Sequence, residues 1–133
     1  SGTVAVLLPG AAFSMGNKVY PDARRLIDAG VEVALSTDCN PGTSFSENLP
    51  LIMSLAAVEL KMTVEEIWKA VTLNAANALG ISDRGMLRFG KKADLVIWDA
   101  QQPEEIPYHY GASFARTVVK AGHPIGKLVR DGA

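Results

Sequence analysis

The sequence has few of the features that mark secreted, membrane or nucleic-acid-binding proteins. It has one cysteine, Cys39, which excludes an internal disulfide framework and fits a reducing compartment. Its formal net charge of -1 gives no electrostatic support for binding to nucleic acid or to an anionic membrane. No apolar run approaches the roughly 20 residues that a membrane-spanning helix needs. We therefore expect a cytoplasmic protein with no nucleic-acid or membrane partner.

The composition is that of an ordinary globular protein. With 48% hydrophobic and 20% charged residues, the 133-residue chain is long enough to bury a core as one domain. No charged-then-apolar leader opens the sequence, so nothing suggests export. The chain starts Ser1-Gly2-Thr3, without a methionine, and runs directly into an apolar stretch. We therefore expect it to be a segment of a longer protein.

The stretch VEVALSTDCNPGT, residues 31–43, organises the rest of the chain. Its apolar start predicts a buried strand, and Asp38 follows at the C-terminal end of that strand. In α/β proteins this end of the sheet is where ligands and catalytic groups collect. Asp, Asn, Pro and Gly are also common turn formers, so from this stretch alone Asp38 is equally well explained as the start of a turn.

The first third of the chain predicts a βαβ unit. Residues 3–8 are apolar and β-branched, which favours a strand, and residues 10–16 are small and flexible, which favours a loop. Residues 21–29 have proline in the first turn and Gly30 at the stop position of a helix. With the strand at residues 31–37, the unit implies parallel strands and a right-handed crossover.

Two longer helices and a β-rich end follow. Ser44 to Glu47 has capping-box spacing and predicts a helix from there to about Leu60. A second capping box at Thr63 predicts one helix running to Gly80. From about residue 86 the chain is β-rich, with strands expected at residues 93–98, 116–121 and 125–129, and an irregular segment at residues 101–115.

Three segments belong together as a pattern: Leu7-Leu8-Pro9-Gly10-Ala11, Ser36-Thr37-Asp38-Cys39-Asn40-Pro41-Gly42-Thr43 and Tyr108-His109-Tyr110-Gly111. Together they resemble the C-terminal part of the imidazolonepropionase family of metal-dependent amidohydrolases. The run AVTLNAANAL at residues 70–79, with Gly80, Gly85 and GKKADLV at residues 90–96, is similar to a signature of the wider superfamily.

The resemblance implies an α/β fold, namely the C-terminal part of a (β/α)8 TIM-like barrel with part of a small β-sandwich. A complete barrel needs roughly 250 residues, more than this chain has. Residues 1–86 would be the last two β/α units of the barrel, and residues 87–133 the C-terminal portion of the β-sandwich. The His-x-His pair and the other metal-binding histidines of the family would lie outside the chain.

The resemblance also implies an activity, the hydrolysis of 4-imidazolone-5-propanoate to N-formimidoyl-L-glutamate. The cofactor would be zinc or iron, the partner a small-molecule substrate, and the assembly a homo-oligomer. Asp38 would be both a metal ligand and the catalytic general base. Asn40, Gly42 and Thr43 would bind the substrate, although ordinary turn chemistry also explains these three residues. We expect the isolated chain to be inactive, because one carboxylate does not retain a metal ion.

Other polar and aromatic residues favour structural roles. His109 is expected at the edge of a site and His123 in a surface turn, since two distant histidines make no metal-ligand spacing. Cys39 is expected to pack beside the metal ligand. The tryptophans Trp68 and Trp98 are expected in the core, and the Lys91-Lys92 pair in a solvated turn.

Two rival functions remain open at the level of sequence. One is another metal-dependent amidohydrolase, a deaminase or dihydroorotase-like enzyme, against which the Asn-Pro-Gly-Thr loop argues. The other is a non-catalytic α/β module that self-associates through exposed sheet edges and apolar helix faces.

Overall fold

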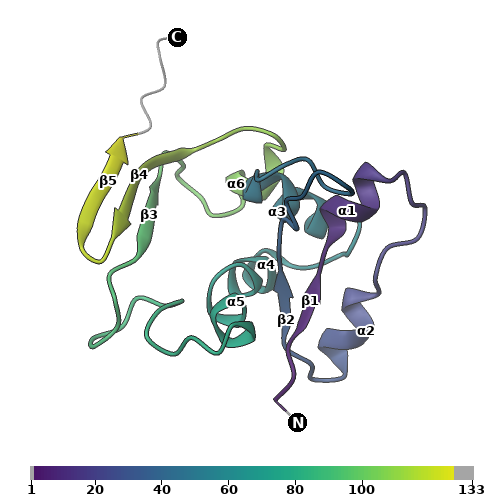
Figure 1. Ribbon diagram of the computed structural model, residues 1–133, viewed down its shortest axis with the longest axis horizontal. Coiled ribbons are helices and arrows are strands. Elements are labelled where there is room, and N and C mark those ends of the chain that lie inside the picture. The colour runs from purple at the N-terminus through teal and green to yellow at the C-terminus, as the bar shows by residue number, and fades with distance from the viewer. Residues whose placement is uncertain (1, 128–133) are drawn as a thin grey trace.

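The computed structural model describes residues 2–127 and contains two separate sheets (Figure 1). The first sheet pairs β1 (Ala5–Leu7) with β2 (Val33–Leu35), and the second has the order β3–β4–β5. Its strands are β3 (Leu95–Trp98), β4 (Ala115–Lys120) and β5 (His123–Lys127). The helices are α1 (Pro9–Ser14), α2 (Ala23–Asp28), α3 (Leu49–Val58), α4 (Val64–Ala70), α5 (Leu73–Ala78) and α6 (Glu105–Tyr108).

The expected βαβ unit is present. β1 and β2 are parallel, with Ala5 opposite Val33 and Leu7 opposite Leu35, and helix α2 connects them. The Asp22 side chain caps α2 by accepting a hydrogen bond from the Arg25 N–H. Strand β2 is buried along its whole length and contacts α2, α4 and α5. Both strands therefore end at the same edge of the sheet, next to the stretch that follows β2.

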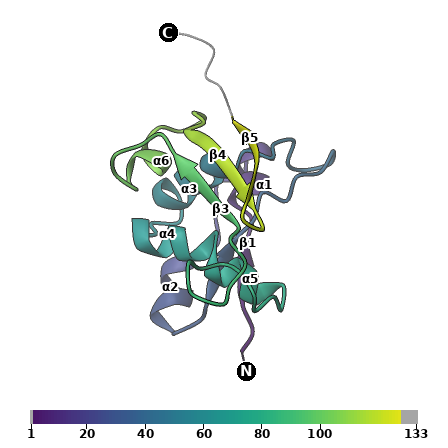
Figure 2. The same ribbon diagram turned by 90° about the vertical axis from the view of Figure 1, so that its left-hand side faces the viewer.

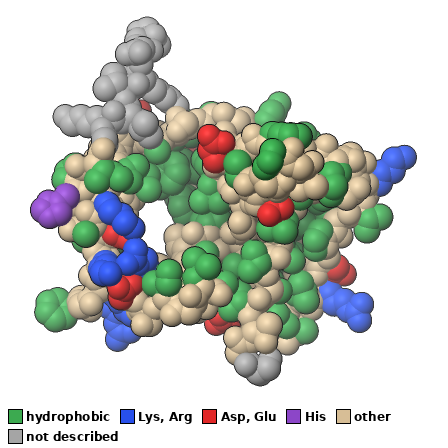
Figure 3. All heavy atoms as spheres, in the orientation of Figure 1, with side chains coloured by type: hydrophobic (Ala, Val, Ile, Leu, Met, Phe, Trp, Pro, Cys, Tyr) green, Lys and Arg blue, Asp and Glu red, His purple; other side chains and the backbone are tan. Residues whose placement is uncertain are grey.

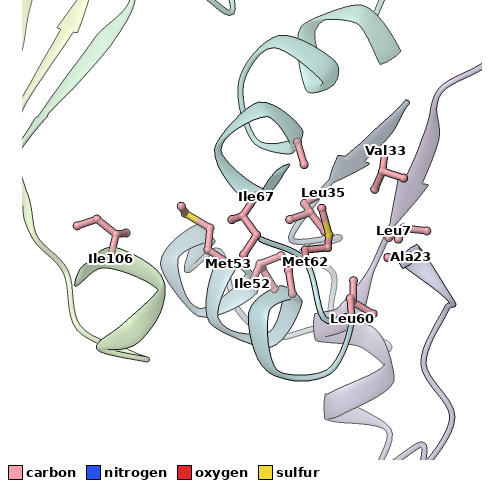
Figure 4. Close-up of a cluster of buried hydrophobic side chains, with 12 residues drawn as sticks. Leu7, Ala23, Val33, Leu35, Ile52, Met53, Leu60, Met62, Ile67 and Ile106 are labelled. Atoms are coloured by element: carbon pink, nitrogen blue, oxygen red, sulfur yellow. The ribbon is translucent and has the colours of Figure 1, made fainter. Parts of the chain in front are cut away.

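One apolar core joins this sheet to the helices (Figure 4). Side chains from β1, β2, α3 and α4 converge there, and Ile106 of α6 packs on the same cluster. Its fully buried members include Ile52 and Ile67, which are 1% and 0% exposed. Burying a side chain of this size stabilises the fold by about 1.5–3 kcal/mol relative to leaving it in water. The core fixes α3 and α4 against the strands and so holds the edge at which Asp38 lies.

The segment at residues 10–16, expected to be a loop, instead forms helix α1. Pro9 occupies the first helical position, where its missing N–H costs no hydrogen bond. Ala11 and Ala12 are buried, and α1 contacts α3. Small residues here serve close packing rather than flexibility.

The prediction of a helix start at residues 44–47 was also wrong. Helix α3 begins at Leu49, and the Asn48 side chain caps it by accepting a 3.0 Å hydrogen bond from the Leu51 N–H. Ser44 does not cap a helix, because its hydroxyl donates to the Thr37 carbonyl instead. The polar residues before α3 therefore belong to a structured loop.

The single helix expected after Thr63 is divided into α4 and α5. The capping box of Thr63 and Glu66 is confirmed, since each side chain accepts from the other's backbone N–H. The break lies at Thr72, whose hydroxyl donates to the Trp68 carbonyl one turn earlier, a bond that bends helices. The break lets α5 place Asn74 against the sheet, where its Nδ2 donates to the Val33 carbonyl at 2.8 Å.

The prediction of three strands after residue 86 is confirmed, and the strands are antiparallel, but their first and last residues differ from those expected. The expected last strand, residues 125–129, begins earlier, so His123 lies in β5, paired with Lys120, and not in a turn. Leu128 and Val129 lie outside the described residues. The segment expected to be irregular contains α6, which Glu105 stabilises by accepting from two backbone N–H groups. The proposed boundary at residue 86 stays a prediction.

A charged network fastens this sheet to the preceding loop. The Asp94 carboxylate accepts from Lys120 at 2.6 Å, from Arg84 at 2.9 Å and from the Ala121 N–H at 2.8 Å. The Lys120 contact is the main cause of the lowered pKa of Asp94. Lys92 pairs with Asp83 at 2.8 Å, and Lys91 donates to the Ser82 carbonyl, so the expected solvated turn is bonded to its neighbours.

The two tryptophans bridge the helical part and the second sheet. Trp68 of α4 and Trp98 of β3 meet edge to face, with 5.8 Å between ring centroids. Both are half-buried and pack against the core cluster rather than lying inside it. In the described part of the chain, no helix has the length and apolar character needed to cross a membrane.

Candidate functional site

Asp38 lies where the sequence places it, just beyond the C-terminal end of β2. Two residues, Ser36 and Thr37, separate it from the strand, and its backbone has a φ of 49°. This left-handed conformation is uncommon for residues other than glycine, although aspartate adopts it more readily than most. Asp38 is half-buried, and no side chain or backbone group among residues 2–125 forms a hydrogen bond or ion pair with its carboxylate. Its oxygens are therefore free to bind a ligand.

The backbone around Asp38 is held by three side chains. Ser44 donates from Oγ to the Thr37 carbonyl at 2.7 Å, and the Asp38 N–H donates to Ser36 Oγ at 3.3 Å. Asn40 Nδ2 donates to the Asp38 carbonyl at 2.5 Å. Because of these bonds, the position of Asp38 depends on polar contacts within residues 36–44.

The three expected substrate-binding residues lie together in the same loop. Asn40 Oδ1 accepts from the N–H groups of Gly42 and Thr43, both at 2.8 Å, and Nδ2 donates to Thr43 Oγ1 at 3.1 Å. The loop is closed by a 2.8 Å bond from the Asn40 N–H to the Ser44 carbonyl. Asn40 thus orders the loop, and two N–H groups converge on one oxygen there.

The end of β1 contributes a second wall through α1, which the sequence did not reveal. A Cβ placed on Gly10 would lie 3.7 Å from the Thr37 carbonyl oxygen, 3.4 Å from Ser44 Oγ and 2.6 Å from Ile52 Cδ1. In Figures 1 and 2, residues 36–48 lie beside α1. The segment Leu7-Leu8-Pro9-Gly10-Ala11 was the available signal, and its glycine marks this close approach.

The remaining candidates, Cys39 and His109, have exposed side chains. Cys39 is exposed, with Sγ 3.9 Å from Glu47 Oε2, so the expectation that it packs beside Asp38 was wrong. His109 is exposed; its ring meets that of Tyr108 edge to face and that of Phe114 at a tilt, with centroid distances of 5.0 and 5.4 Å. A role for His109 at the edge of a site stays a prediction.

In the described part of the chain, the donor atoms near Asp38 fit one ligand position of a metal centre. A free carboxylate at a strand end is a suitable ligand for zinc or iron. Within residues 2–127, however, no group of three or more His, Cys, Asp and Glu side chains could hold a metal ion. A complete centre needs further ligands in addition to Asp38.

A large groove lies elsewhere. It has a volume of about 690 Å³ and runs between α4–α5 and the second sheet, and Figure 3 shows this hollow with apolar side chains around it and Lys and Arg side chains along one side. Its lining includes Trp68, Trp98 and Leu79, but neither Asp38 nor any residue of its loop. The candidate site is therefore an open loop at a strand end rather than this groove.

Comparison with known proteins indicates the family and the fold of the chain. Residues 7–125 match the model of the amidohydrolase family. The chain is 54% identical, over its whole length, to an imidazolonepropionase of Bacillus velezensis, and it spans 31% of that protein. Its fold is similar to a zinc-bound adenosine deaminase from Xanthomonas campestris, with a TM-score of 0.78 and 25% identity over 90% of this chain and 31% of that one.

A second solved structure has the same fold. It is an atrazine chlorohydrolase from Arthrobacter aurescens in complex with zinc, with a TM-score of 0.79 and 25% identity over 95% of this chain and 32% of the other. Both structures are enzymes about three times as long as the chain, which supports a partial TIM-barrel-type arrangement. With the family model covering residues 7–125, the chain belongs to the amidohydrolase family.

Proposed function

We propose that this chain supplies the C-terminal third of an imidazolonepropionase, a hydrolase that opens the ring of 4-imidazolone-5-propanoate. The observation that carries the proposal is the 54% identity to the Bacillus velezensis enzyme over the whole chain. Identity to the structurally similar adenosine deaminase is 25%, so the sequence favours the ring-opening reaction over deamination. The matched relatives are about three times longer, so the complete reaction belongs to the longer polypeptide.

Asp38 is proposed as one metal ligand and as the base that takes a proton from the attacking water. Its carboxylate is free of partners in the described chain and stands at a strand end, as both roles require. When bound, zinc or iron supplies Lewis acidity and lowers the pKa of water. The other ligands would come from residues outside this chain.

Asn40, Gly42 and Thr43 are proposed to bind the carboxylate-bearing substrate. The N–H groups of Gly42 and Thr43 point to a common acceptor, Asn40 Oδ1, both at 2.8 Å. A substrate carboxylate is an acceptor of the same kind and carries more charge, so it is suited to share or replace that oxygen. Gly42 is exposed, which leaves the loop open to an incoming ligand.

A chimeric enzyme tests the proposal. Residues 1–133 replace the aligned segment of the Bacillus velezensis imidazolonepropionase, and ring opening is measured together with metal content. We expect turnover with 4-imidazolone-5-propanoate and none with adenine, guanine or cytosine. In the chimera, Asp38→Asn should lower kcat by about 10² to 10⁴-fold, the usual contribution of a general base.

The result also separates the proposal from its rival. A folded, metal-loaded chimera that deaminates a nucleobase and leaves the imidazolone ring intact would assign the chain to the deaminases. A folded chimera without either activity would refute the proposal that the chain supplies this part of the enzyme. Homo-oligomer formation stays a prediction, and light scattering of the 133-residue chain checks it.

A further inference from the structure

We propose that Ser44 is a positioning residue for Asp38. Its buried hydroxyl fixes the peptide group that precedes Asp38 and thereby aims the carboxylate. The inference rests on the proposed role of Asp38, but the contact that carries it lies entirely within the described chain. Ser44 does not touch the reacting atoms; it acts through the backbone.

The Ser44 hydroxyl is placed to restrict one peptide plane. Ser44 is 2% exposed, and its Oγ donates to the Thr37 carbonyl at 2.7 Å. The Thr37 carbonyl and the Asp38 N–H belong to the same planar peptide group, and that N–H donates to Ser36 Oγ at 3.3 Å. With both polar atoms of the plane bonded, the peptide group cannot rotate without breaking a bond.

The next peptide group is fixed from the same loop. Asn40 Nδ2 donates to the Asp38 carbonyl at 2.5 Å, and the Asn40 N–H donates to the Ser44 carbonyl at 2.8 Å. Ser44 therefore contributes twice, through its side chain before Asp38 and through its backbone after it. Together these bonds hold the backbone of Asp38 at its φ of 49°, a conformation that persists only where the surroundings enforce it.

The surroundings of Ser44 explain why a hydroxyl is needed there. Gly10 of α1 approaches so closely that a Cβ on it would lie 3.4 Å from Ser44 Oγ. Removing the hydroxyl takes away the one side-chain donor that the described residues give to the part-buried Thr37 carbonyl, and losing a hydrogen bond of this kind is unfavourable. The backbone at Asp38 is then expected to sample other conformations.

A matched control is present in the same chain. Ser54 is 4% exposed, and its Oγ donates to the Pro50 carbonyl at 3.1 Å within α3. Ser54→Ala removes the same kind of bond, from a serine of similar burial, without touching residues 36–44. Any general cost of losing a buried serine hydroxyl appears in both variants.

The first test uses the 133-residue chain and measures amide hydrogen exchange by NMR. We expect Ser44→Ala to speed exchange at the Asp38 and Asn40 N–H groups about tenfold, since one lost buried hydrogen bond is worth roughly that factor. Ser54→Ala should leave these two amides unchanged. Equal exchange at Asp38 in Ser44→Ala and wild-type chains would overturn the proposal.

The second test uses the chimeric enzyme and separates kcat from KM. Ser44→Ala should lower kcat about tenfold with KM within twofold of wild type, whereas Ser54→Ala should change neither beyond twofold. Ser44→Cys keeps a donor at this position, although a weaker and larger one, and should fall between Ser44→Ala and wild type. An equal loss of kcat in Ser44→Ala and Ser54→Ala refutes positioning. If the unmodified chimera is inert, the proposed function fails, while the exchange result still decides the role of Ser44.

Discussion

The contact between Gly10 and Ile52 predicts an unusual response to a single added methyl group. Gly10 lies in the first turn of α1, and its backbone does not have a positive φ that would exclude alanine. In a helix, alanine is more favourable than glycine by roughly 0.5–1 kcal/mol. The added Cβ would, however, lie 2.6 Å from Ile52 Cδ1, in a side chain that is 1% exposed.

We expect the clash to exceed the gain in helix propensity. Overpacking of a tight core costs about 1–3 kcal/mol, so Gly10→Ala should destabilise the chain by about 1 kcal/mol. Ile52→Val removes Cδ1 and alone should cost about 0.5–1.5 kcal/mol. In that background the clash is absent, and Gly10→Ala should become neutral or stabilising by up to about 1 kcal/mol.

Urea unfolding of the four chains, followed by circular dichroism, measures this double-mutant cycle. The expected coupling between the two sites is about 1–2 kcal/mol, which is well above the error of the method. Additive effects, with the same cost of Gly10→Ala in both backgrounds, would show that α1 does not press on Ile52. Helix α1 would then also not be packed tightly against residues 36–44, the loop around Asp38, which Gly10 approaches from the same side.

Three further outcomes test the helix caps and ion pairs. Thr63→Ala removes one half of the capping box and should cost about 1 kcal/mol in urea unfolding. Arg24 bonds Glu66 at 2.6 Å and lowers the pKa of Glu66 below its ordinary 4.5. The stability from this pair is therefore present above pH 4.5 and lost as the pH falls through the lowered value, so Arg24→Gln should destabilise the chain at pH 7 and not at pH 2. Arg84 is the main cause that lowers the pKa of Asp83 to about 2, and Arg84→Gln should raise the titration midpoint of that carboxyl, read by carbon NMR.

Elements specified by local sequence were predicted well. The strand before Asp38 is a continuous apolar run, and the Thr63 capping box is a pattern within four residues, so neither depends on distant contacts. The position of Asp38 at the strand end followed from the same run. The sequence did not predict that the Asp38 carboxylate is free. Ser36 and Asn40 bond to the backbone of Asp38 and not to its carboxylate, and only the folded chain shows this.

Elements that depend on tertiary contacts were missed. Helix α1 is short and contains glycine, and it is stabilised by packing on Ile52 and on the Asp38 loop, which lie far along the chain. Ser44 has the spacing of a helix cap, yet its hydroxyl bonds to Thr37 across the loop. The break at Thr72 likewise depends on one hydroxyl donating to the preceding turn.

The Asn74 amide determines where a further strand can join β2. Glu32 and Ser36 make backbone bonds to β1, and alternate residues of a strand point their backbone groups to opposite edges, so the Val33 carbonyl faces away from β1. Asn74 Nδ2 already occupies that carbonyl at 2.8 Å. An extended segment that arrives at this edge would therefore compete with Asn74 for the Val33 carbonyl but not for Leu35, the next residue that faces this edge. This competition favours a ladder that begins at Leu35 and disfavours a slipped pairing.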